Sequence, residues 1–187
     1  MCNAARSDAT AYGPEWRTLV LQDRGEWSET NSRLFPVTTR LVRDVARAPS
    51  VEVFFARQAA GSGIAAHTDG NNFILCAHLG LRVPAGGAEA CWVKCGDAPA
   101  RAWEAGKAMV FDTSFIHETW NSSAEDRIVL IIRFWHFGLS PAEVVATQWL
   151  FDASDDTSRE GLQAATRVAQ RRLAEVTKPK SKGFGKR

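Results

Sequence analysis

The chain has 187 residues, of which 45% are hydrophobic and 24% are charged, and its formal net charge is +2. These values are typical of one globular domain with a sizeable core. No apolar run approaches the ~20 residues that cross a bilayer, so we expect no transmembrane segment.

The charge pattern and the first residues exclude two further classes of protein. The basic surplus is concentrated in the tail KPKSKGFGKR. A solvated terminus explains this tail better than a nucleic-acid surface does, so we expect no nucleic-acid partner. The start, MCNAARSDAT, lacks a basic stretch followed by an apolar core, which predicts a soluble, cytoplasmic protein without a signal peptide.

The segment before residue 51 is expected to hold an irregular arm and one helix. Residues 1–35 mix Gly, Pro, Ser and charged residues with isolated tryptophans, which predicts an arm held in place by aromatic side chains. From Thr38, the pattern TTRLVRDVARA has apolar residues at helical spacing, and Pro49 follows it. This pattern predicts a short amphipathic helix.

Short apolar or β-branched runs, separated by turn residues, dominate residues 51–135. Several strands at short spacing with Gly-rich turns indicate an antiparallel sandwich or barrel of the jelly-roll kind. No helical pattern interrupts the series, which argues against a parallel sheet. The runs are VEVFFARQ, FILCAHLGLRVP, ACWVKC, RAWEAGKAMVFDTS, FIHETW and RIVLIIRFWHF.

Two helices are expected after the strands. Ser140 and Glu143 have the spacing of a capping box, with Pro141 at the first helical position, so a helix should run from about Pro141 to Phe151. A second helix is expected over about 158–176, before the basic tail.

The segment HTDG places His67 two residues before Asp69. On an extended backbone, residues two apart point to the same side with Cα atoms ~6.5 Å apart, so both side chains can reach one cation. An alternative interpretation is a surface histidine followed by an aspartate that starts a turn at Gly70.

A second histidine, His117, stands in FDTSFIHETW at a predicted strand end. Two histidines and one carboxylate on one side of a metal form the facial triad of non-haem Fe(II) oxygenases, which leaves positions open for substrate and dioxygen. Zinc could use the same ligands. His67, Asp69 and His117 are therefore the candidate metal ligands and catalytic residues.

Arg127 opens the strand RIVLIIRFW, ten residues after His117. If NSSAED is a hairpin turn, the two strands pair and bring guanidinium and imidazole to one pocket mouth. An arginine beside a ferrous site suits a dicarboxylate co-substrate, because its fork binds the distal carboxylate. The alternative is an exposed arginine that pairs with Asp126 or Glu125.

His78 and the cysteines lie within predicted strands. His78 shares a face with Ile74 and Cys76, so it is expected to be a core residue that could still donate a hydrogen bond to an anion. Cys91 and Cys95 are four apart in ACWVKC. On a strand that places them ~13 Å apart, beyond the reach of a disulfide, so buried free thiols are expected.

Three segments together resemble the aspartyl/asparaginyl β-hydroxylase family of Fe(II)/2-oxoglutarate-dependent oxygenases. They are HTDGNNFILCAHLGLRVP, AWEAGKAMVFDTSFIHETWN and RIVLIIRFWH, with order and spacing kept. The resemblance implies a mainly β double-stranded β-helix of the cupin-like jelly-roll kind, with flanking N- and C-terminal helices. It also implies a catalytic domain over residues 1–150, with its core at about 51–141, followed by a C-terminal helix and basic tail over 151–187.

The resemblance also implies a ligand set. Iron would bind His67 and His117, with Asp69 as the carboxylate ligand as in bacterial members. The co-substrate 2-oxoglutarate would pair with Arg127 and contact His78, and O2 would be consumed. Trp103 to Lys107 and the FDTS turn resemble scaffold around the pocket.

Two positions depart from the family pattern. Cys76 stands where members commonly carry an arginine, and Ala56 stands where a hydroxyl-bearing residue often occurs. The resemblance implies a dioxygenase that hydroxylates an aspartyl or asparaginyl unit in a peptide or amino acid, and the departure at Cys76 leaves alternatives open. The alternatives are the same chemistry on proline, a lipid acyl chain or a peptide natural product, or a non-catalytic cupin-like metal-binding protein.

Overall fold

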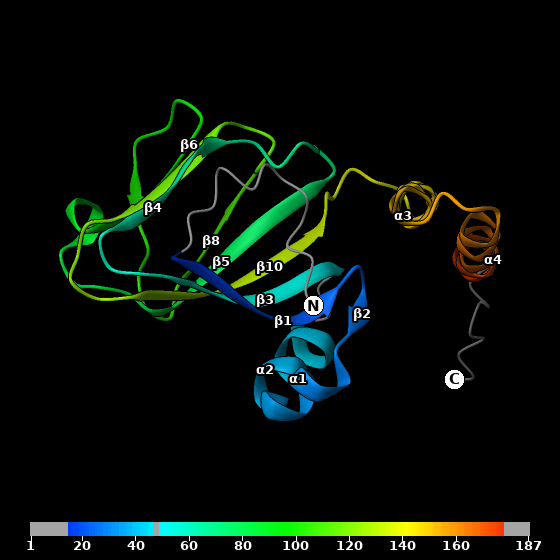
Figure 1. The fold of residues 1–187 in the computed structure, drawn as a ribbon, viewed down its shortest axis with the longest axis horizontal. Coiled ribbons are helices and arrows are strands. Elements are labelled where there is room, and N and C mark those ends of the chain that lie inside the picture. The colour runs from blue at the N-terminus through cyan, green and yellow to red at the C-terminus, as the bar shows by residue number, and fades with distance from the viewer. Residues whose placement is uncertain (1–14, 47–48, 178–187) are drawn as a thin grey trace, which may run out of the picture. The chain divides into compact units, whose positions relative to one another are not determined.

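The computed structural model describes residues 15–46 and 49–177 of the chain. The chain divides into two compact units, Met1–His136 and Phe137–Arg187. The strands all belong to the first unit (Figure 1).

The larger sheet of the first unit has six strands, and its neighbouring pairs are antiparallel. In spatial order the strands are β2 (Glu26–Trp27), β1 (Trp16–Asp23), β3 (Ser50–Gln58), β10 (Arg127–Trp135), β5 (Ile74–Arg82) and β8 (Ala108–Phe111). β10 is thus a central strand, flanked by β3 and β5.

The smaller sheet has four antiparallel strands. In spatial order they are β4 (Ser62–His67), β9 (His117–Asn121), β6 (Cys91–Cys95) and β7 (Arg101–Ala102). A short 3₁₀ turn, η2 (Gly87–Glu89), precedes β6.

The strand order is that of a jelly roll. From β3 onward the chain passes repeatedly from one sheet to the other, and the first strand of this series, β3, pairs with the last, β10. Two antiparallel sheets connected in this way form a double-stranded β-helix. The predicted mainly β, cupin-like fold with flanking helices is therefore confirmed.

The predicted hairpin between the strands of His117 and Arg127 is wrong. β9 pairs with β4 and β6, whereas β10 pairs with β3 and β5. Residues 122–126 cross from one sheet to the other. Asn121 holds this crossing, because its Nδ2 donates to the carbonyl oxygens of Glu125 at 2.8 Å and Ala59 at 3.1 Å. A short turn between two apolar runs does not by itself say whether the runs pair or face each other across a core.

The irregular arm predicted before residue 36 is also wrong for its described part. Residues 16–23 form β1, which pairs with β3 from Trp16 opposite Gln58 to Gln22 opposite Val53. The run TLVL is apolar and β-branched enough for a strand, and its flanking charges obscured this pattern.

The N-terminal helices lie beside β1 and β2 (Figure 1). α1 (Glu29–Leu34) begins after Ser28, whose side chain accepts a hydrogen bond from the backbone of Asn31. α2 (Pro36–Arg40) continues into a π-helical turn, η1 (Leu41–Ala46). The helix predicted from Thr38 is thus confirmed and starts two residues earlier.

Two apolar clusters cover the two faces of the large sheet. The first includes Val129 and Ile131 of β10 together with Cys91 and Val93 of β6, so it fills the space between the sheets. The second includes Leu130 of β10 with residues of β1, β3 and η1. Alternate residues of β10 therefore face opposite cores.

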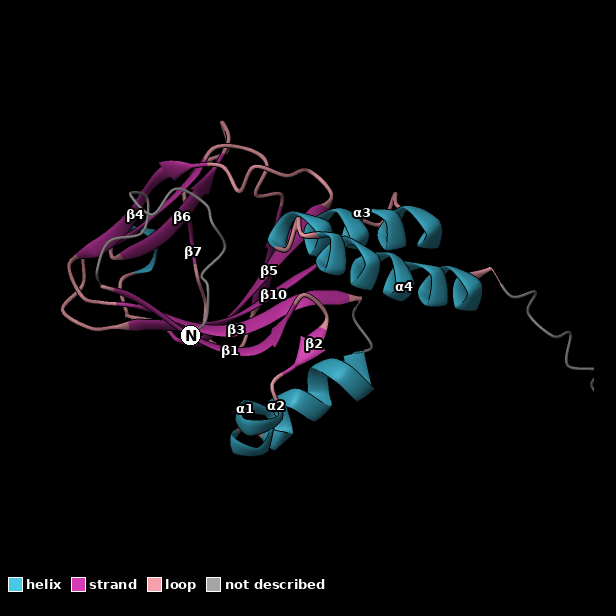
Figure 2. Ribbon diagram, turned by 45° about the vertical axis from the view of Figure 1, so that its right-hand side comes forward, coloured by secondary structure: helices cyan, strands magenta, loops and turns pink. Residues whose placement is uncertain are grey.

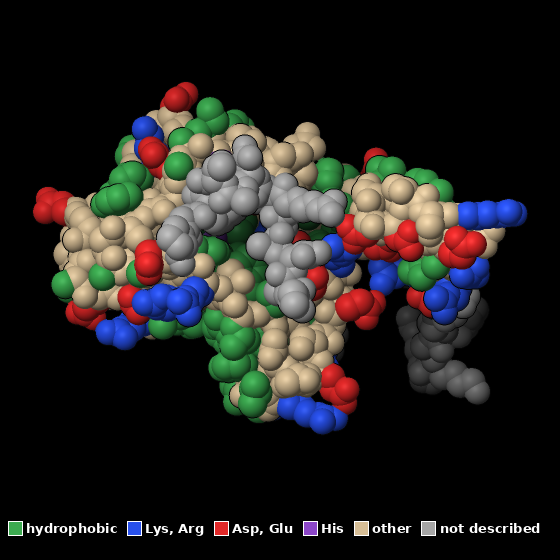
Figure 3. Space-filling view, viewed as in Figure 1, with side chains coloured by type: hydrophobic (Ala, Val, Ile, Leu, Met, Phe, Trp, Pro, Cys, Tyr) green, Lys and Arg blue, Asp and Glu red, His purple; other side chains and the backbone are tan. Residues whose placement is uncertain are grey.

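An exposed apolar stripe follows the N-terminal helices. Figure 3 shows hydrophobic side chains gathered over this part of the first unit. The stripe consists of Leu34, Val37, Leu41 and Val45.

The second unit is a pair of helices, α3 (Pro141–Asp155) and α4 (Arg159–Val176), which lie side by side (Figure 2). The predicted capping box is confirmed, since Ser140 and Glu143 exchange both hydrogen bonds. Trp149 of α3 donates to Thr166 of α4 at 3.2 Å. None of the helices in the described residues has the length and apolar character needed to span a membrane.

Candidate metal centre and buried arginine

Three side chains converge where β4 and β9 meet. His67 ends β4, His117 begins β9, and the two are partners in the strand register. Asp69 follows β4, and its Oδ1 lies 3.8 Å from His67 Nε2 and 3.9 Å from His117 Nε2. The three ligand atoms lie within 4.8 Å of one another. Within the described ranges no second group of three or more such side chains was found.

Each histidine is oriented by the backbone carbonyl group two residues before it. Nδ1 of His67 lies 2.8 Å from the carbonyl oxygen of Ala65, and Nδ1 of His117 lies 3.0 Å from that of Phe115. A carbonyl oxygen only accepts, so each Nδ1 carries the proton and each Nε2 presents a lone pair toward Asp69. This tautomer is the one that metal-binding histidines adopt.

The electrostatic environment keeps His117 neutral. Burial lowers the pKa of its imidazole from 6.5, which outweighs the hydrogen bond to Phe115 and the attraction of Asp69. Neutral imidazole is the form that binds a metal. Two imidazoles and one carboxylate therefore fit a divalent cation such as Fe(II) or Zn(II).

Asp69 is held by both its backbone and its side chain. Its backbone N–H donates to the carbonyl oxygen of Thr113 at 3.0 Å, and its Oδ2 lies 3.2 Å from Nη2 of Arg133. Nη1 of Arg133 lies 2.9 Å from Oε2 of Glu52. Burial opposes the charge of Arg133, but these two carboxylates raise the pKa of its guanidinium above the ordinary value.

Reasoning from the sequence missed Arg133. The signal was present, because Arg133 is an even number of residues from Arg127 in the strand RIVLIIRFW and so faces the same side. A charged residue at an inward position of an apolar strand indicates a buried partner.

Arg127 lies in the core between the sheets. Its side chain is 0% exposed, and none of its three guanidinium nitrogens has a hydrogen-bond partner among the described residues. Its Cζ lies 4.2 Å from the ring centre of Trp103 and 5.4 Å from that of Trp16. Burial lowers the pKa of Arg127 to about 10, so the group is still a cation at neutral pH.

The alternative in which Arg127 pairs with neighbouring acids is wrong. Asp126 is paired with Arg57 at 2.7 Å, and Glu125 is paired with Arg82 at 3.1 Å. The acids next to Arg127 in sequence are therefore occupied by arginines at the surface.

His78 is connected to Arg127 through Trp103. The indole Nε1 of Trp103 donates to Nδ1 of His78 at 3.2 Å, and the two rings are nearly parallel, at 10°, with centres 6.0 Å apart. Burial, then the charges of Arg127 and His117, lower the pKa of His78 well below 6.5. A neutral imidazole that accepts at Nδ1 carries its proton on Nε2, which makes Nε2 a hydrogen-bond donor.

The cysteines of the strands are free thiols. Cys91 and Cys95 lie on β6 as predicted, with Cys91 buried and Cys95 partly buried. Cys76 is buried on β5, directly opposite Arg133 of β10. Burial raises the pKa of Cys76 to about 12, so the thiol is neutral.

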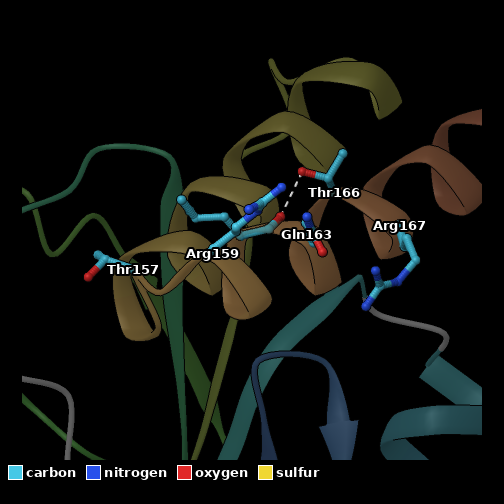
Figure 4. Close-up of a pocket in the computed structure, with 6 residues that line it drawn as sticks. Thr157, Arg159, Gln163, Thr166 and Arg167 are labelled. Carbon is cyan, nitrogen blue, oxygen red and sulfur yellow. Dashed lines mark hydrogen bonds between the residues drawn. The ribbon is translucent and has the colours of Figure 1, made fainter.

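A groove on the helices of the second unit is a weaker candidate. Figure 4 shows Arg159, Gln163 and Arg167 along α4, and Thr166 donates from its hydroxyl to the carbonyl oxygen of Leu162 at 2.8 Å. The lining has no histidine, cysteine or acid, so it offers no metal ligands of these types.

Comparison with known proteins matches the strand-bearing unit to one protein family. A family model described as aspartyl/asparaginyl beta-hydroxylase matches residues 2–137. The chain is 29% identical over 132 residues to the mouse aspartyl/asparaginyl beta-hydroxylase, which covers 69% of this chain and 17% of that protein.

Two further relatives cover similar parts of the chain. One is the human aspartate beta-hydroxylase domain-containing protein 2, 31% identical over 73% of this chain and 38% of that protein. The other is the ornithine lipid ester-linked acyl 2-hydroxylase of Rhizobium tropici, 32% identical over 70% of this chain and 45% of that protein. The matched region is less than half the length of each of these relatives.

Among solved structures, the Cupin_2 domain of an XRE family transcriptional regulator from Enterobacter cloacae aligns with a TM-score of 0.43 at 14% identity. The alignment covers 65% of this chain and 98% of that chain.

Proposed function

The chain belongs to the aspartyl/asparaginyl beta-hydroxylase family, and from this premise we propose that it is an Fe(II)- and 2-oxoglutarate-dependent dioxygenase. Its substrate in this proposal is an aspartyl or asparaginyl unit in a peptide or amino acid. The metal ligands are His67, Asp69 and His117, and the co-substrate residues are Arg127 and His78.

The observation that carries the proposal is the buried Arg127. The Arg127 guanidinium is 0% exposed and has no hydrogen-bond partner among the described residues, which is a costly state for a buried cation. A carboxylate bound bidentately would satisfy its fork and neutralise its charge. In this proposal the keto-acid end of the same dicarboxylic ligand chelates the metal.

The surrounding side chains fit this role. Trp103 and Trp16 cover the Arg127 guanidinium with apolar rings, which excludes water and strengthens an ion pair formed there. The Nε2 proton of His78 supplies a second donor to an oxygen of the same ligand. Neither Arg127 nor His78 needs to change its protonation state when the ligand binds.

The metal ligands hold their part of the site in place. His67 and His117 each bind through Nε2, because Nδ1 is committed to a backbone carbonyl. Asp69 supplies the charge that balances a divalent ion. Bound iron supplies the activation of dioxygen, so that a substrate C–H, 2-oxoglutarate and O2 are converted to C–OH, succinate and CO2.

The test is substrate-stimulated formation of succinate together with a +16 Da product. The full chain would be supplied with Fe(II) and 2-oxoglutarate and screened against aspartyl, asparaginyl and prolyl compounds. Succinate and hydroxylated product in equal amounts are the expected result. Metal binding without 2-oxoglutarate turnover on any substrate would instead favour a non-catalytic cupin-like metal-binding protein.

A second substrate class is favoured by the residues around the metal ligands. Phe115 and Ile116, which directly precede His117, are 59% and 65% exposed. Position 76 holds a neutral thiol, and Arg133 opposite it is already paired with two acids. These exposed apolar side chains next to His117 suit an acyl chain, which is the substrate named for the Rhizobium tropici relative. Acyl-bearing lipids therefore belong in the same screen.

A further inference from the structure

Arg133 occupies the centre of the large sheet next to the metal ligands. Its Cα partners are Glu52 on β3 and Cys76 on β5. The side chain is only 8% exposed, although it is charged. Burying an arginine is costly unless its charge and donors are matched. Two acids match the charge of Arg133, whereas its Nε has no hydrogen-bond partner among the described residues.

One guanidinium bridges two carboxylates. Nη1 lies 2.9 Å from Oε2 of Glu52, and Nη2 lies 3.2 Å from Oδ2 of Asp69. The other oxygen of Asp69, Oδ1, is the one that lies 3.8 Å and 3.9 Å from the two histidine Nε2 atoms. The two oxygens of Asp69 thus have different partners before any metal binds.

We propose that Arg133, fixed by Glu52, is a positioning residue that occupies one oxygen of Asp69 so that the carboxylate binds the metal through the other oxygen alone. The inference rests on the proposed metal centre. A carboxylate bound through both oxygens would fill a further coordination position, and a facial triad must leave its remaining positions to co-substrate and dioxygen. Arg133 keeps that position available.

Glu52 gives the arrangement its charge balance. Glu52 and Arg133 together are neutral, so Asp69 retains its full negative charge toward a divalent cation. Without Glu52, the positive charge of Arg133 would offset the negative charge of Asp69 and repel the metal ion. Glu52 therefore supports metal binding although it is not among the three candidate ligands.

The experiment uses the full chain loaded with Co(II) in the absence of oxygen, so that its readout is independent of turnover. The visible absorption of Co(II) reports the coordination, and titration gives the affinity for 2-oxoglutarate. In Arg133→Met we expect altered Co(II) bands and 2-oxoglutarate binding that is weaker by ~10-fold, a size equal to the smallest loss of metal affinity or activity usually seen when a partner that orients a metal ligand is removed. Arg133→Lys should restore part of both properties, because an ammonium group can still donate a hydrogen bond to Asp69, although it lacks the two-pronged guanidinium that bridges Asp69 and Glu52.

Arg57→Met is the matched control, since it also removes an arginine from an ion pair on the large sheet, that with Asp126. It should leave the Co(II) spectrum and 2-oxoglutarate affinity as in the wild type. A folded Arg133→Met protein with the wild-type spectrum and affinity overturns the inference. If Arg133→Met does not fold, Glu52→Gln decides, because it should weaken Co(II) binding several-fold. Unchanged or tighter Co(II) binding in Glu52→Gln would then overturn the inference.

Asp69→Ala separates this inference from the proposed function. If it leaves Co(II) binding intact, the metal centre itself is wrong. If it abolishes Co(II) binding while Arg133→Met resembles the wild type, the metal centre stands and only the positioning role is lost.

Discussion

The guanidinium of Arg127 lies 4.2 Å from the centre of the Trp103 ring, and both side chains are buried between the two sheets. The same indole donates its N–H to His78. One tryptophan therefore supports both proposed co-substrate contacts, a role that goes beyond the scaffold expected from the sequence.

Replacing Arg127 with methionine should affect stability and ligand binding in opposite directions. The unliganded protein should be more stable by about 1–3 kcal/mol, because a buried cation without a partner is removed. Binding of 2-oxoglutarate should weaken by at least ~2 kcal/mol, about 30-fold. Thermal unfolding of the Co(II)-loaded protein with and without 2-oxoglutarate measures both, and a variant that the ligand still stabilises fully would contradict the assignment.

Asp69→Ala should remove the charge that balances a divalent ion. We expect Mn(II) binding, measured by calorimetry, to weaken by at least ~100-fold, since changes outside the ligand set already cost ~10–100-fold. Asp112→Ala is a suitable control, because Asp112 caps the nearby turn at Ser114 and is not a member of the triad. Retention of Mn(II) affinity and turnover in Asp69→Ala would exclude it as a ligand.

Trp103→Phe separates the two contacts of the indole. An aromatic ring would still cover Arg127, but the hydrogen bond to His78 would be lost at a cost of about 1 kcal/mol. Without that donor the His78 tautomer is no longer fixed. Nitrogen-15 NMR of the imidazole should show a single tautomer in the wild type and a mixture in the variant, and an unchanged spectrum would contradict the tautomer assignment.

The stability of the metal-free protein should fall at acid pH because of His78. Burial lowers the pKa of its imidazole well below 6.5 in the folded state, whereas the unfolded chain takes up a proton near 6.5. The contribution of His78 is therefore present above that pH and is lost as the pH falls toward the folded pKa. The slope approaches about 1.4 kcal/mol per pH unit.

Denaturant unfolding at a series of pH values measures this slope. His78→Gln should flatten it, because the amide does not titrate. A variant with the wild-type slope would assign the acid sensitivity to other groups.

The sequence predicts the elements of this fold better than their partners. Strand runs, the capping box at Ser140 and the two C-terminal helices follow from local patterns, which is why they could be identified. The pairing of β9 could not, because a short turn after Asn121 is equally compatible with a hairpin and with a crossing between sheets. Sheet membership depends on contacts with strands far away in the chain.

The candidate site shows the same division. Residues two apart, such as His67 and Asp69, share a side by local geometry alone. Arg133 lies on β10 of the large sheet, whereas Asp69 follows β4 of the small sheet, so only the assembled fold shows their contact. Its inward position could be read from its spacing to Arg127, but its partners could not.

β10 bears Arg127 and Arg133 on one face, six residues apart. At ~3.3 Å per residue, their Cα atoms are separated by ~20 Å along a strand whose two edges are both occupied. Such a strand fixes the distance between Arg127, the proposed co-substrate residue, and Arg133, which contacts the candidate metal ligand Asp69. Loops at the rim can lengthen or change sequence without altering this spacing, whereas a single inserted residue between the arginines would turn one of them to the opposite core. Changes in the loops can therefore alter the choice of substrate, whereas insertions in β10 would disrupt the arrangement of the two arginines.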